Sequence, residues 1–352
     1  MENIRVVIWG FGAMGRGMAD MLLDKDGADV VGACDIHPDR VGRDMHDLLG
    51  RERGRDPRVV VSENIDAVLR SGGADIALLA TDSFTEAAFP KIEKLMNAGL
   101  NVISTAEEMS YPAAQHPDLA ERIDRLARKA GVTVLGAGIN PGLIMDLLVL
   151  VLTGACRDVR HIEARRVNSL SPFGPAVMEE QGVGLGPEEF ERRVSDGSLA
   201  GHVGFPESVR MIADGLGWIL DGPVEQTRRA IVSSVERSTP YARVEAGRVA
   251  GCDQRGRGFV GGEERIRMIH PQQIEPEAEG ISTGDFITID GNPKVAMAIT
   301  PEIPGGTGTV AMCVNMIPQV MNAAPGLKTM LDLPVPRAIL GDMRDRIEGR
   351  DR

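Results

Sequence analysis

Short apolar stretches alternate with amphipathic stretches along the first 140 residues. The short stretches are rich in β-branched residues, as in strands buried on both faces of a parallel sheet. The amphipathic stretches have the apolar spacing of helices and end near glycine or another helix breaker. This pattern predicts strands at 5–9, 29–34, 58–61, 75–81, 101–105 and 132–135. It predicts helices at 14–25, 41–49, 64–70, 85–98 and 119–129. The alternation favours an α/β fold with a doubly wound parallel sheet.

The pattern changes after Gly136, where longer strands with period-two alternation follow one another between loops rich in glycine and proline. It predicts a helix at 143–152, a late helix at 305–321 that returns to the first domain, and strands at 160–168, 230–237, 241–249, 264–269 and 285–290. We therefore expect a parallel-sheet domain at 1–145, a second domain of α+β type at 146–304, and a C-terminal helix and tail at 305–352.

Composition narrows the possible partners. The chain has 39 basic and 51 acidic residues, a net charge of −12, and 3% aromatic residues, so it is poorly suited to phosphate backbones or stacked bases. No apolar run approaches the roughly 20 residues that cross a bilayer. The first residues enter a strand without a visible secretory signal, and the four cysteines form no CxxC pair. We expect reduced thiols, a cytoplasmic location, and neither nucleic acid nor membrane as partner.

A glycine-rich motif follows the first strand and opens the first helix. It consists of Gly10, Phe11, Gly12, Ala13, Met14 and Gly15. Such a GxGxxG turn lets the backbone approach a pyrophosphate at a helix N-terminus, as in the Rossmann fold. Asp35 ends the second strand, where a carboxylate can accept hydrogen bonds from the adenosine ribose. This predicts NAD used at least as well as NADP, although Arg40 and Arg43 leave room for a 2′-phosphate.

Two adjacent acids, Glu107 and Glu108, follow the fifth strand at the carboxyl edge of the predicted sheet, where ligands of such sheets bind. In an extended segment they point to opposite faces, so one of them can face a nicotinamide. The alternative is a pair of solvated loop charges. Thr81 ends the fourth predicted strand, at the same edge, and we expect it to contact the cofactor.

Three further features carry candidate chemistry. Asn140 and Pro141 have the ordinary order of a helix cap and first helical residue, although the same loop leaves room for a nicotinamide. His202 precedes a helix that begins at Pro206 and should be neutral there, unless it is a surface or packing histidine. Arg166 can clamp a carboxylate or pair with a nearby acid. The six histidines show no metal-ligand spacing, and we predict no metal.

The order of the motifs GFGAMG, STAEEMSYP, GAGINPGLIMD, GHVGFPES and GGTGTVAMCVN resembles the 2,4-diaminopentanoate dehydrogenases and the related NAD(P)-dependent amine dehydrogenases. The resemblance covers nearly the whole chain. It implies a homodimer with a Rossmann domain and a dihydrodipicolinate-reductase-like domain for substrate and dimerisation. The implied reaction converts an amine reversibly to a ketone and ammonia, with NAD or NADP as cofactor.

The resemblance also implies site residues. Glu107 matches the catalytic acid, Asn140 and Pro141 match positions near the cofactor, and His202 matches the histidine of the GHVG segment. Ile139, Phe173 and Phe205 are expected as pocket walls. The alternatives are an imine reductase of the dihydrodipicolinate reductase type, whose His-His and Lys-containing segment is missing here, and a nicotinamide-sensing protein without catalysis.

Overall fold

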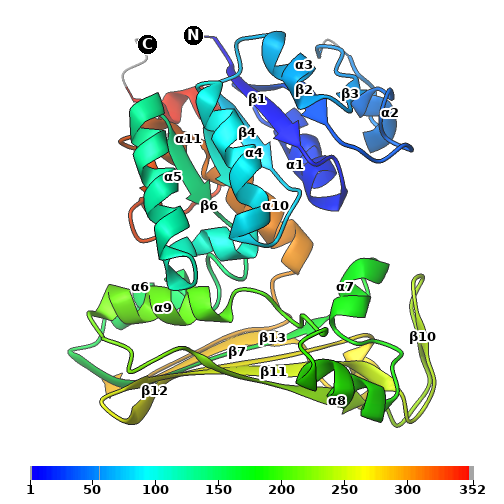
Figure 1. Ribbon diagram of the computed structural model, residues 1–352, viewed down its shortest axis with the longest axis vertical. Coiled ribbons are helices and arrows are strands. Elements are labelled where there is room, and N and C mark those ends of the chain that lie inside the picture. Colours follow the sequence, from blue (N-terminus) through cyan, green and yellow to red (C-terminus); the bar gives the residue numbers. More distant parts are fainter. Residues whose placement is uncertain (1, 55, 349–352) are drawn as a thin grey trace. The chain divides into compact units, whose positions relative to one another are not determined.

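The computed structural model of the chain describes residues 2–54 and 56–348. These residues divide into two compact units (Figure 1). The first unit contains the described residues up to Leu143 and from Gly305 onward, and the second contains residues 144–304. No helix in the described part of the chain is both long and apolar enough to span a membrane.

The first unit is built on a parallel sheet with the strand order β15-β6-β5-β4-β1-β2-β3. Its strands are β1 (Ile4–Trp9), β2 (Ala28–Cys34), β3 (Val61–Ser62), β4 (Ile76–Leu79), β5 (Asn101–Ser104), β6 (Thr133–Gly136) and β15 (Gly326–Lys328). Its α-helices are α1 (Ala13–Leu23), α2 (Met45–Leu49), α3 (Ile65–Arg70), α4 (Thr85–Asn97), α5 (Pro117–Ala130), α10 (Gly305–Asn315) and α11 (Ile317–Asn322). Its 3₁₀ helices are η1 (Glu107–Ser110), η2 (Pro112–Ala114) and η4 (Met343–Arg346).

The sheet confirms the predicted fold class. All six expected strands form, with ends that differ by a few residues, and the sequence pattern missed only the short β15 at the edge. The late helix expected at 305–321 is two helices, α10 and α11. Helix α10 packs against α1, where a Cβ on Gly17 would lie 2.7 Å from the Val310 side chain. The small size of residue 17 therefore allows the last part of the chain to join the first unit.

The helix expected at 143–152 begins later than predicted. Helix α6 (Leu147–Thr153) starts after Asp146, whose carboxylate accepts a hydrogen bond of 2.6 Å from the Leu147 N–H. Residues 140–146 form turns, the Asn140–Pro141 peptide bond is cis, and Gly142 has a φ of 126°. The reading of Asn140 and Pro141 as a helix start is therefore wrong, because the backbone at Gly142 is outside the helical region.

The second unit is built on a mixed sheet with the order β14-β13-β7-β12-β11-β8, in which only the β7–β12 pair is parallel. Its strands are β7 (Asp158–Ser169), β8 (Glu225–Val232), β11 (Val249–Val260), β12 (Glu263–Gln273), β13 (Gly284–Asn292) and β14 (Val295–Ile299), with β9 (Arg237–Ser238) and β10 (Arg243–Val244) in a separate hairpin. Its helices are α6, α7 (Pro175–Glu180), α8 (Pro187–Ser195), α9 (Phe205–Leu216) and the 3₁₀ helix η3 (Pro276–Glu279).

The strand predictions for this unit were partly wrong. The segment expected at 230–237 contains the end of β8 and the first residue of β9, and the segment expected at 241–249 contains β10 and only the first residue of β11. The pattern missed the rest of β11 and all of β14. The glycines of β11 interrupt the sequence pattern by which a strand is predicted. A Cβ on Gly256 would lie 2.7 Å from the Phe205 ring, and one on Gly258 would lie 2.7 Å from the Val209 side chain. Glycine is unfavourable in strands, but here it lets α9 lie directly on the sheet.

A buried ion pair joins β7 to β13. Arg166 and Asp285 lie opposite each other in the sheet, at 2% and 0% exposure. The Arg166 guanidinium donates hydrogen bonds to the Asp285 carboxylate and, at 2.6 Å, to the Ile303 carbonyl. The Ile303 N–H in turn donates to the Asp285 carboxylate at 3.0 Å. The sequence left two alternatives for Arg166, a clamp for a carboxylate or a pair with a nearby acid. The structure contains the pair with a nearby acid.

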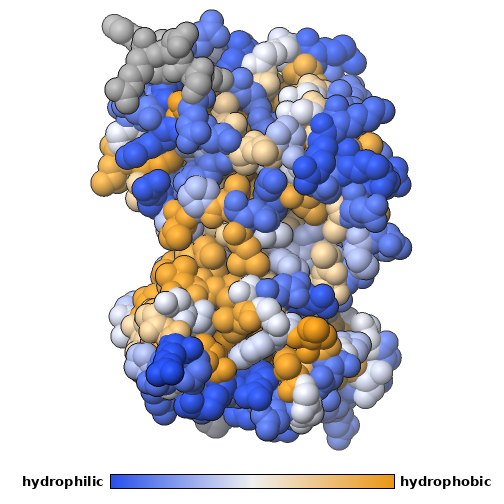
Figure 2. Space-filling model, turned by 90° about the vertical axis from the view of Figure 1, so that its left-hand side faces the viewer, coloured by the Kyte–Doolittle hydropathy of each residue, from blue (hydrophilic) through white to orange (hydrophobic). Residues whose placement is uncertain are grey.

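Helix α6 is apolar on every side, with the sequence LLVLVLT. Leu147 and Val149 are buried, whereas Val151 is 47% exposed. The space-filling view shows hydrophobic side chains at the surface over this helix (Figure 2). A helix that is hydrophobic all round usually has its faces covered, so this part of the second unit is suited to contact with another surface.

The packing of α9 on β11 gives a first prediction. Gly256→Ala should destabilise the second unit by about 1–3 kcal/mol, because the new methyl group collides with the Phe205 ring. Gly222→Ala, which places a methyl group in open space, serves as the control and should change stability by about 0.5 kcal/mol at most. Urea unfolding of both variants measures the difference. Equal midpoints would show that α9 does not rest on this glycine.

The buried ion pair gives a second prediction. Arg166→Leu should lower the free energy of unfolding by about 3–5 kcal/mol, because it leaves the Asp285 carboxylate buried without its partner. The double variant Arg166→Leu/Asp285→Leu should recover much of that loss, since no buried charge remains. Urea unfolding followed by circular dichroism measures both. A double variant less stable than the single one would contradict this account.

Candidate active site

The glycine-rich turn between β1 and α1 is shaped by close backbone contacts. Gly10 has a φ of 95°, and a Cβ there would lie 2.3 Å from the Ala80 carbonyl oxygen. A Cβ on Gly15 would lie 1.9 Å from the Gly10 carbonyl oxygen. At Gly12, by contrast, the nearest atom is 3.8 Å away, so the backbone at the start of α1 can be approached. These residues fit a pyrophosphate held by N–H groups at a helix N-terminus.

The other residues of the motif have different surroundings. Phe11 is fully buried and belongs to the core. Ala13 is exposed in the first turn of α1, and Met14 is half-buried. Thr81 is exposed just after β4, and its hydroxyl donates a hydrogen bond to Asp82. All four residues, like the glycines, lie at or near the carboxyl ends of β1 and β4.

Asp35 fastens the turn to the end of β2. Its carboxylate accepts hydrogen bonds from the Phe11 N–H at 2.6 Å and from the His37 N–H at 2.8 Å. The Arg40 guanidinium lies 3.1 and 3.2 Å from the two carboxylate oxygens. Burial raises the pKa of Asp35, but the bonds from His37, Arg40 and Phe11 outweigh this and lower the pKa below its usual value. The carboxylate is therefore anionic and already engaged by the protein.

Arg40 lies beside the phosphate-binding turn. Its Nη1 atom is the nearest atom to the position of a Cβ on Gly12, and the side chain is 29% exposed. Arg43 is directed elsewhere, with a long contact of 3.5 Å to the Asp39 carbonyl. Of the two arginines that the sequence offered for a 2′-phosphate, Arg40 is thus the one next to both Gly12 and Asp35.

Glu107 and Glu108 lie in the 3₁₀ helix η1, so the expectation of an extended segment was wrong. Their surroundings nevertheless differ. Glu107 is half-buried at the carboxyl edge of β5, whereas Glu108 is 5% exposed and accepts a 2.7 Å hydrogen bond from the Thr85 N–H. Behind them, a Cβ on Gly136 would lie 2.0 Å from the Met109 carbonyl, so the end of β6 packs directly against η1.

The segment after β6 lies along α10. The Ile139 N–H donates to the Thr309 hydroxyl at 3.3 Å. The Ile139 side chain is 4% exposed and packs against Gly308, where an added Cβ would lie 2.8 Å from it. Asn140 is half-buried and Pro141 is buried. These three residues are thus held at the same edge of the first unit as Glu107.

A second group of candidate residues lies in the second unit, where β7, β11 and β12 meet the start of α9. The His202 ring is 4.6 Å from the His270 ring and 5.6 Å from the Phe205 ring. His270 forms a 2.9 Å hydrogen bond with the Asn168 side chain. The Gln254 side chain holds the backbone of His202, accepting from its N–H at 2.8 Å and donating to its carbonyl at 2.9 Å.

Both imidazole rings are neutral. Burial, with contributions from the positive charges of Arg166 and Arg228, lowers the pKa of His202 to about 3. Burial, His202 and Arg166 hold the pKa of His270 well below its ordinary value. The expectation of a neutral His202 rested on the N-terminus of α9, but the main cause is burial. A neutral ring can donate and accept a hydrogen bond at once.

The structure thus brings Arg166, His202 and Phe205 into one region and places Phe173 with another group, the buried cluster around Leu170 and Met178. The sequence analysis missed His270, Gln254 and Asp285. Asn168 ends the strand that the sequence predicted at 160–168, but no role was predicted for it. No local motif marks these residues, because their proximity comes from the pairing of β7 with β12 and β13.

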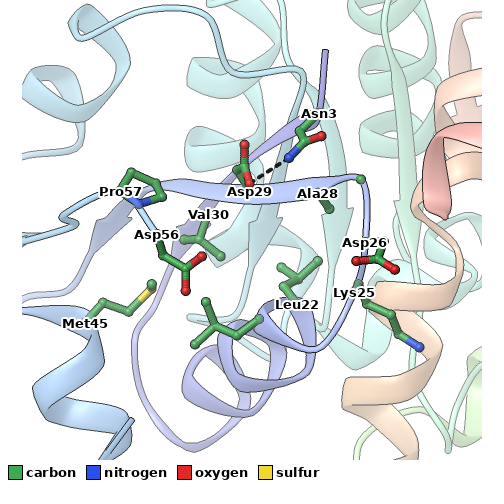
Figure 3. A pocket seen from close by; sticks show the side chains of 12 residues that line it. Asn3, Leu22, Lys25, Asp26, Ala28, Asp29, Val30, Met45, Asp56 and Pro57 are labelled. Carbon is green, nitrogen blue, oxygen red and sulfur yellow. Dashed lines mark hydrogen bonds between the residues drawn. The ribbon is translucent and has the colours of Figure 1, made fainter. Parts of the chain in front are cut away.

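A cavity of about 230 Å³ lies near the start of β2, at the opposite edge of the first sheet from the glycine-rich turn (Figure 3). Of the carboxylates that line it, Asp29 accepts from Asn3 and Asp56 contacts His46. Within residues 2–54 and 56–348, no group of three or more His, Cys, Asp or Glu side chains is placed to hold a metal ion.

Comparison with known proteins identifies both parts of the chain. Residues 4–137 match the oxidoreductase family with an NAD-binding Rossmann fold, and residues 143–349 match the 2,4-diaminopentanoate dehydrogenase C-terminal domain. The chain is 57% identical to the 2,4-diaminopentanoate dehydrogenase of Acetoanaerobium sticklandii over 347 residues, covering 99% of this chain and 98% of that protein. It is 27% identical to an amine dehydrogenase of Streptomyces virginiae, over 96% of this chain and 98% of that protein.

Solved structures agree. The amine dehydrogenase from Mycobacterium smegmatis superposes with a TM-score of 0.86 at 27% identity, over 97% of this chain and 98% of that one. A biliverdin reductase from Synechocystis, at 14% identity and a TM-score of 0.51 over 84% of this chain and 79% of that one, shares the fold alone. The resemblance stated from the motifs is confirmed. The chain belongs to the 2,4-diaminopentanoate dehydrogenase family of NAD(P)-dependent oxidoreductases.

Proposed function

We propose that this protein catalyses the reversible oxidative deamination of 2,4-diaminopentanoate, or of a closely related primary amine, to the ketone and ammonia. The observation that carries the proposal is the 57% identity, over nearly the full length, to a protein named for that substrate. The position of Glu107 at the carboxyl edge of β5, the same edge at which the glycine-rich turn lies, supports it.

The reaction balances in two steps. An amine on a CH carbon, having lost the proton of its ammonium form, gives up hydride and becomes an iminium ion, and water then adds and expels ammonia to leave the ketone. The bound nicotinamide dinucleotide supplies the hydride acceptor, and a proton is released overall. In this chain Gly10, Gly12, Gly15 and the N–H groups at the start of α1 would hold the dinucleotide, with Asp35 and Arg40 beside the ribose.

Glu107 is the proposed catalytic residue. A carboxylate beside the reacting carbon stabilises the positive charge of the iminium ion. It also accepts a proton from the attacking water. Neutral water needs such a base in order to add to the iminium ion. Thr81, Asn140 and Pro141, which lie at the same edge of the first unit, are proposed to border the cofactor.

The second unit is proposed to bind the substrate. His202, a neutral donor and acceptor, and Phe205 are the proposed contacts, and Ile139 and Phe173 remain proposed pocket walls. Arg166 is already bound to Asp285 and Ile303, so we propose that it helps to shape the substrate site and is not a free bidentate clamp for a substrate carboxylate.

Assembly and location complete the proposal. We propose a homodimer formed by the second unit, supported by the exposed apolar side of α6. We also propose that the protein works in the cytoplasm. The thiols of Cys34, Cys156, Cys252 and Cys313 are all free, and burial raises the pKa of Cys252 and of Cys313 to about 12, so those two are unreactive.

The catalytic role gives a third prediction. Glu107→Gln should bind NADH and NADPH with unchanged affinity, yet lose roughly 10²–10⁴-fold in turnover, because the amide neither stabilises the iminium ion nor accepts a proton. Nucleotide fluorescence measures binding, and initial rates with saturating amine measure turnover. Glu121→Gln, on the exposed face of α5, is the matched control and should retain wild-type rates. A fully active Glu107→Gln enzyme would exclude this residue as the catalyst.

Cofactor binding gives a fourth prediction. Asp35→Ala should weaken the binding of both NADH and NADPH, because the Phe11 N–H loses the acceptor that holds the turn. Arg40→Ala should weaken the binding of NADPH about tenfold or more and the binding of NADH much less, because an ion pair with the 2′-phosphate is worth about 1.5–3 kcal/mol. Arg43→Ala is the control. An Asp35→Ala enzyme with tighter NADPH binding would instead show that the Asp35 carboxylate acts mainly by repelling the 2′-phosphate.

A further inference from the structure

The 3₁₀ helix η1, which carries Glu107, is fastened to α4 through its neighbour Glu108. The Glu108 N–H donates to the Ser83 carbonyl at 3.1 Å, and its carboxylate accepts from the Thr85 N–H at 2.7 Å. Thr85 is the first residue of α4, where N–H groups have no partner within the helix and favour a negative charge. The two bonds fix Glu108 from both its backbone and its side chain.

The Glu108 carboxylate also contacts the start of α5, and its Oε2 atom is shared between the Thr85 N–H and His116. The His116 Nε2 atom lies 3.3 Å from Oε2, and the Gln115 amide lies 3.3 Å from Oε1. His116 is 26% exposed at the N-cap position of α5, and its Nδ1 atom is 3.9 Å from the exposed carboxylate of Glu86 on α4. Glu108 is thus held between α4 and α5, and the His116 imidazole is one of its two contacts on the α5 side.

Burial makes these contacts important. Glu108 is 5% exposed, and a buried carboxylate is costly unless hydrogen-bond donors replace the water it has lost. Without the His116 imidazole, the carboxylate keeps only the Thr85 N–H and the Gln115 amide as side-chain contacts, so we expect it to turn toward solvent. Such a turn moves η1, because Glu108 is one residue from Glu107 in a helix of four residues. A displacement of about 1 Å at a reacting group costs on the order of 10²-fold in rate.

We propose that His116 is a positioning residue for the reaction: through Glu108 it holds η1, and hence Glu107, in the orientation that catalysis needs. This inference rests on the proposed catalytic role of Glu107. It assigns a function to a histidine and an acid that the proposed reaction does not use, and it gives the second glutamate of the AEEM segment a role different from that of the first.

The test is a double-mutant cycle on turnover in the full-length enzyme. His116→Leu removes the donor, and His116→Gln retains an amide donor of similar reach. Each is made in the wild-type enzyme and in Glu108→Gln, which keeps an acceptor for the Thr85 N–H but removes the buried charge. His161→Leu, a half-exposed histidine that lies 3.4 Å from Glu264 in the second unit, is the matched control. The readouts are kcat, KM for the amine, NADPH affinity and the unfolding midpoint.

The expected result is that His116→Leu lowers kcat about tenfold in the wild-type enzyme, with KM and NADPH affinity unchanged. In Glu108→Gln the same change should lower kcat less than about threefold, because interacting residues are not additive. His116→Gln should restore kcat to within about threefold of the wild-type value, and His161→Leu should leave kcat unchanged. A tenfold loss in both backgrounds, or a loss confined to the unfolding midpoint, would overturn the proposal.

Glu107→Gln, measured alongside, separates this inference from the function on which it rests. If Glu107→Gln is inactive and the cycle shows no coupling, the positioning role is wrong while the proposed function stands. If Glu107→Gln retains full turnover, the catalytic assignment fails, and the positioning role fails with it.

Discussion

The hydrogen bond from the Phe11 N–H to the Asp35 carboxylate joins the glycine-rich turn to the end of β2. On the other side of the turn, Gly10 packs against the Ala80 carbonyl after β4. Three adjacent strands therefore determine where α1 begins. Because β1 lies inside the sheet, between β4 and β2, the same contacts set the position of the edge at which Glu107, Thr81 and Asn140 lie. Cofactor binding and catalysis thus depend on one tightly packed turn.

Charge is arranged differently in the two units. In the first, backbone N–H groups donate to the carboxylates of Asp35 and Glu108, and they help to keep the pKa of Asp35 below its usual value. In the second, two imidazoles are kept neutral near the paired charges of Arg166 and Asp285. The proposed reaction removes a proton from an ammonium group and then forms an iminium ion. A site for this reaction needs an anion that stabilises the positive charge. It also needs neutral polar groups, which do not compete with the iminium ion for that anion. The two arrangements supply these separately.

The sequence alone predicted the parts of the fold that depend on local patterns. The strands and helices of the first unit follow apolar periodicity, and the roles of Gly10, Gly12 and Gly15 follow from the motif and its context. β11 escaped because its glycines are explained only by α9, which is distant in sequence. The start of α6 was misjudged because the conformation of Gly142 and the cap at Asp146 outweigh the Asn-Pro signal.

The candidate site shows the same division. Glu107 was found from its place after a strand, but the role of Glu108 depends on Thr85 and His116, which reach it from two other helices. The partner of Arg166 stands 119 residues away along the chain, and His270 meets His202 only after β12 pairs with β7. Contacts of this kind are set by strand register, which a single sequence does not display.

We propose that this chain oxidises an amine with a nicotinamide dinucleotide bound at the carboxyl edge of its parallel sheet. The most direct measurement incubates the wild-type enzyme with 2,4-diaminopentanoate and NADP⁺ or NAD⁺ and quantifies reduced nucleotide, ammonia and the oxo product in the same samples. The account predicts equal amounts of all three, and the reverse reaction from 2-amino-4-oxopentanoate in ammonium buffer. Nucleotide binding without reduction by this or any other primary amine, at any pH from 7 to 10, would contradict it.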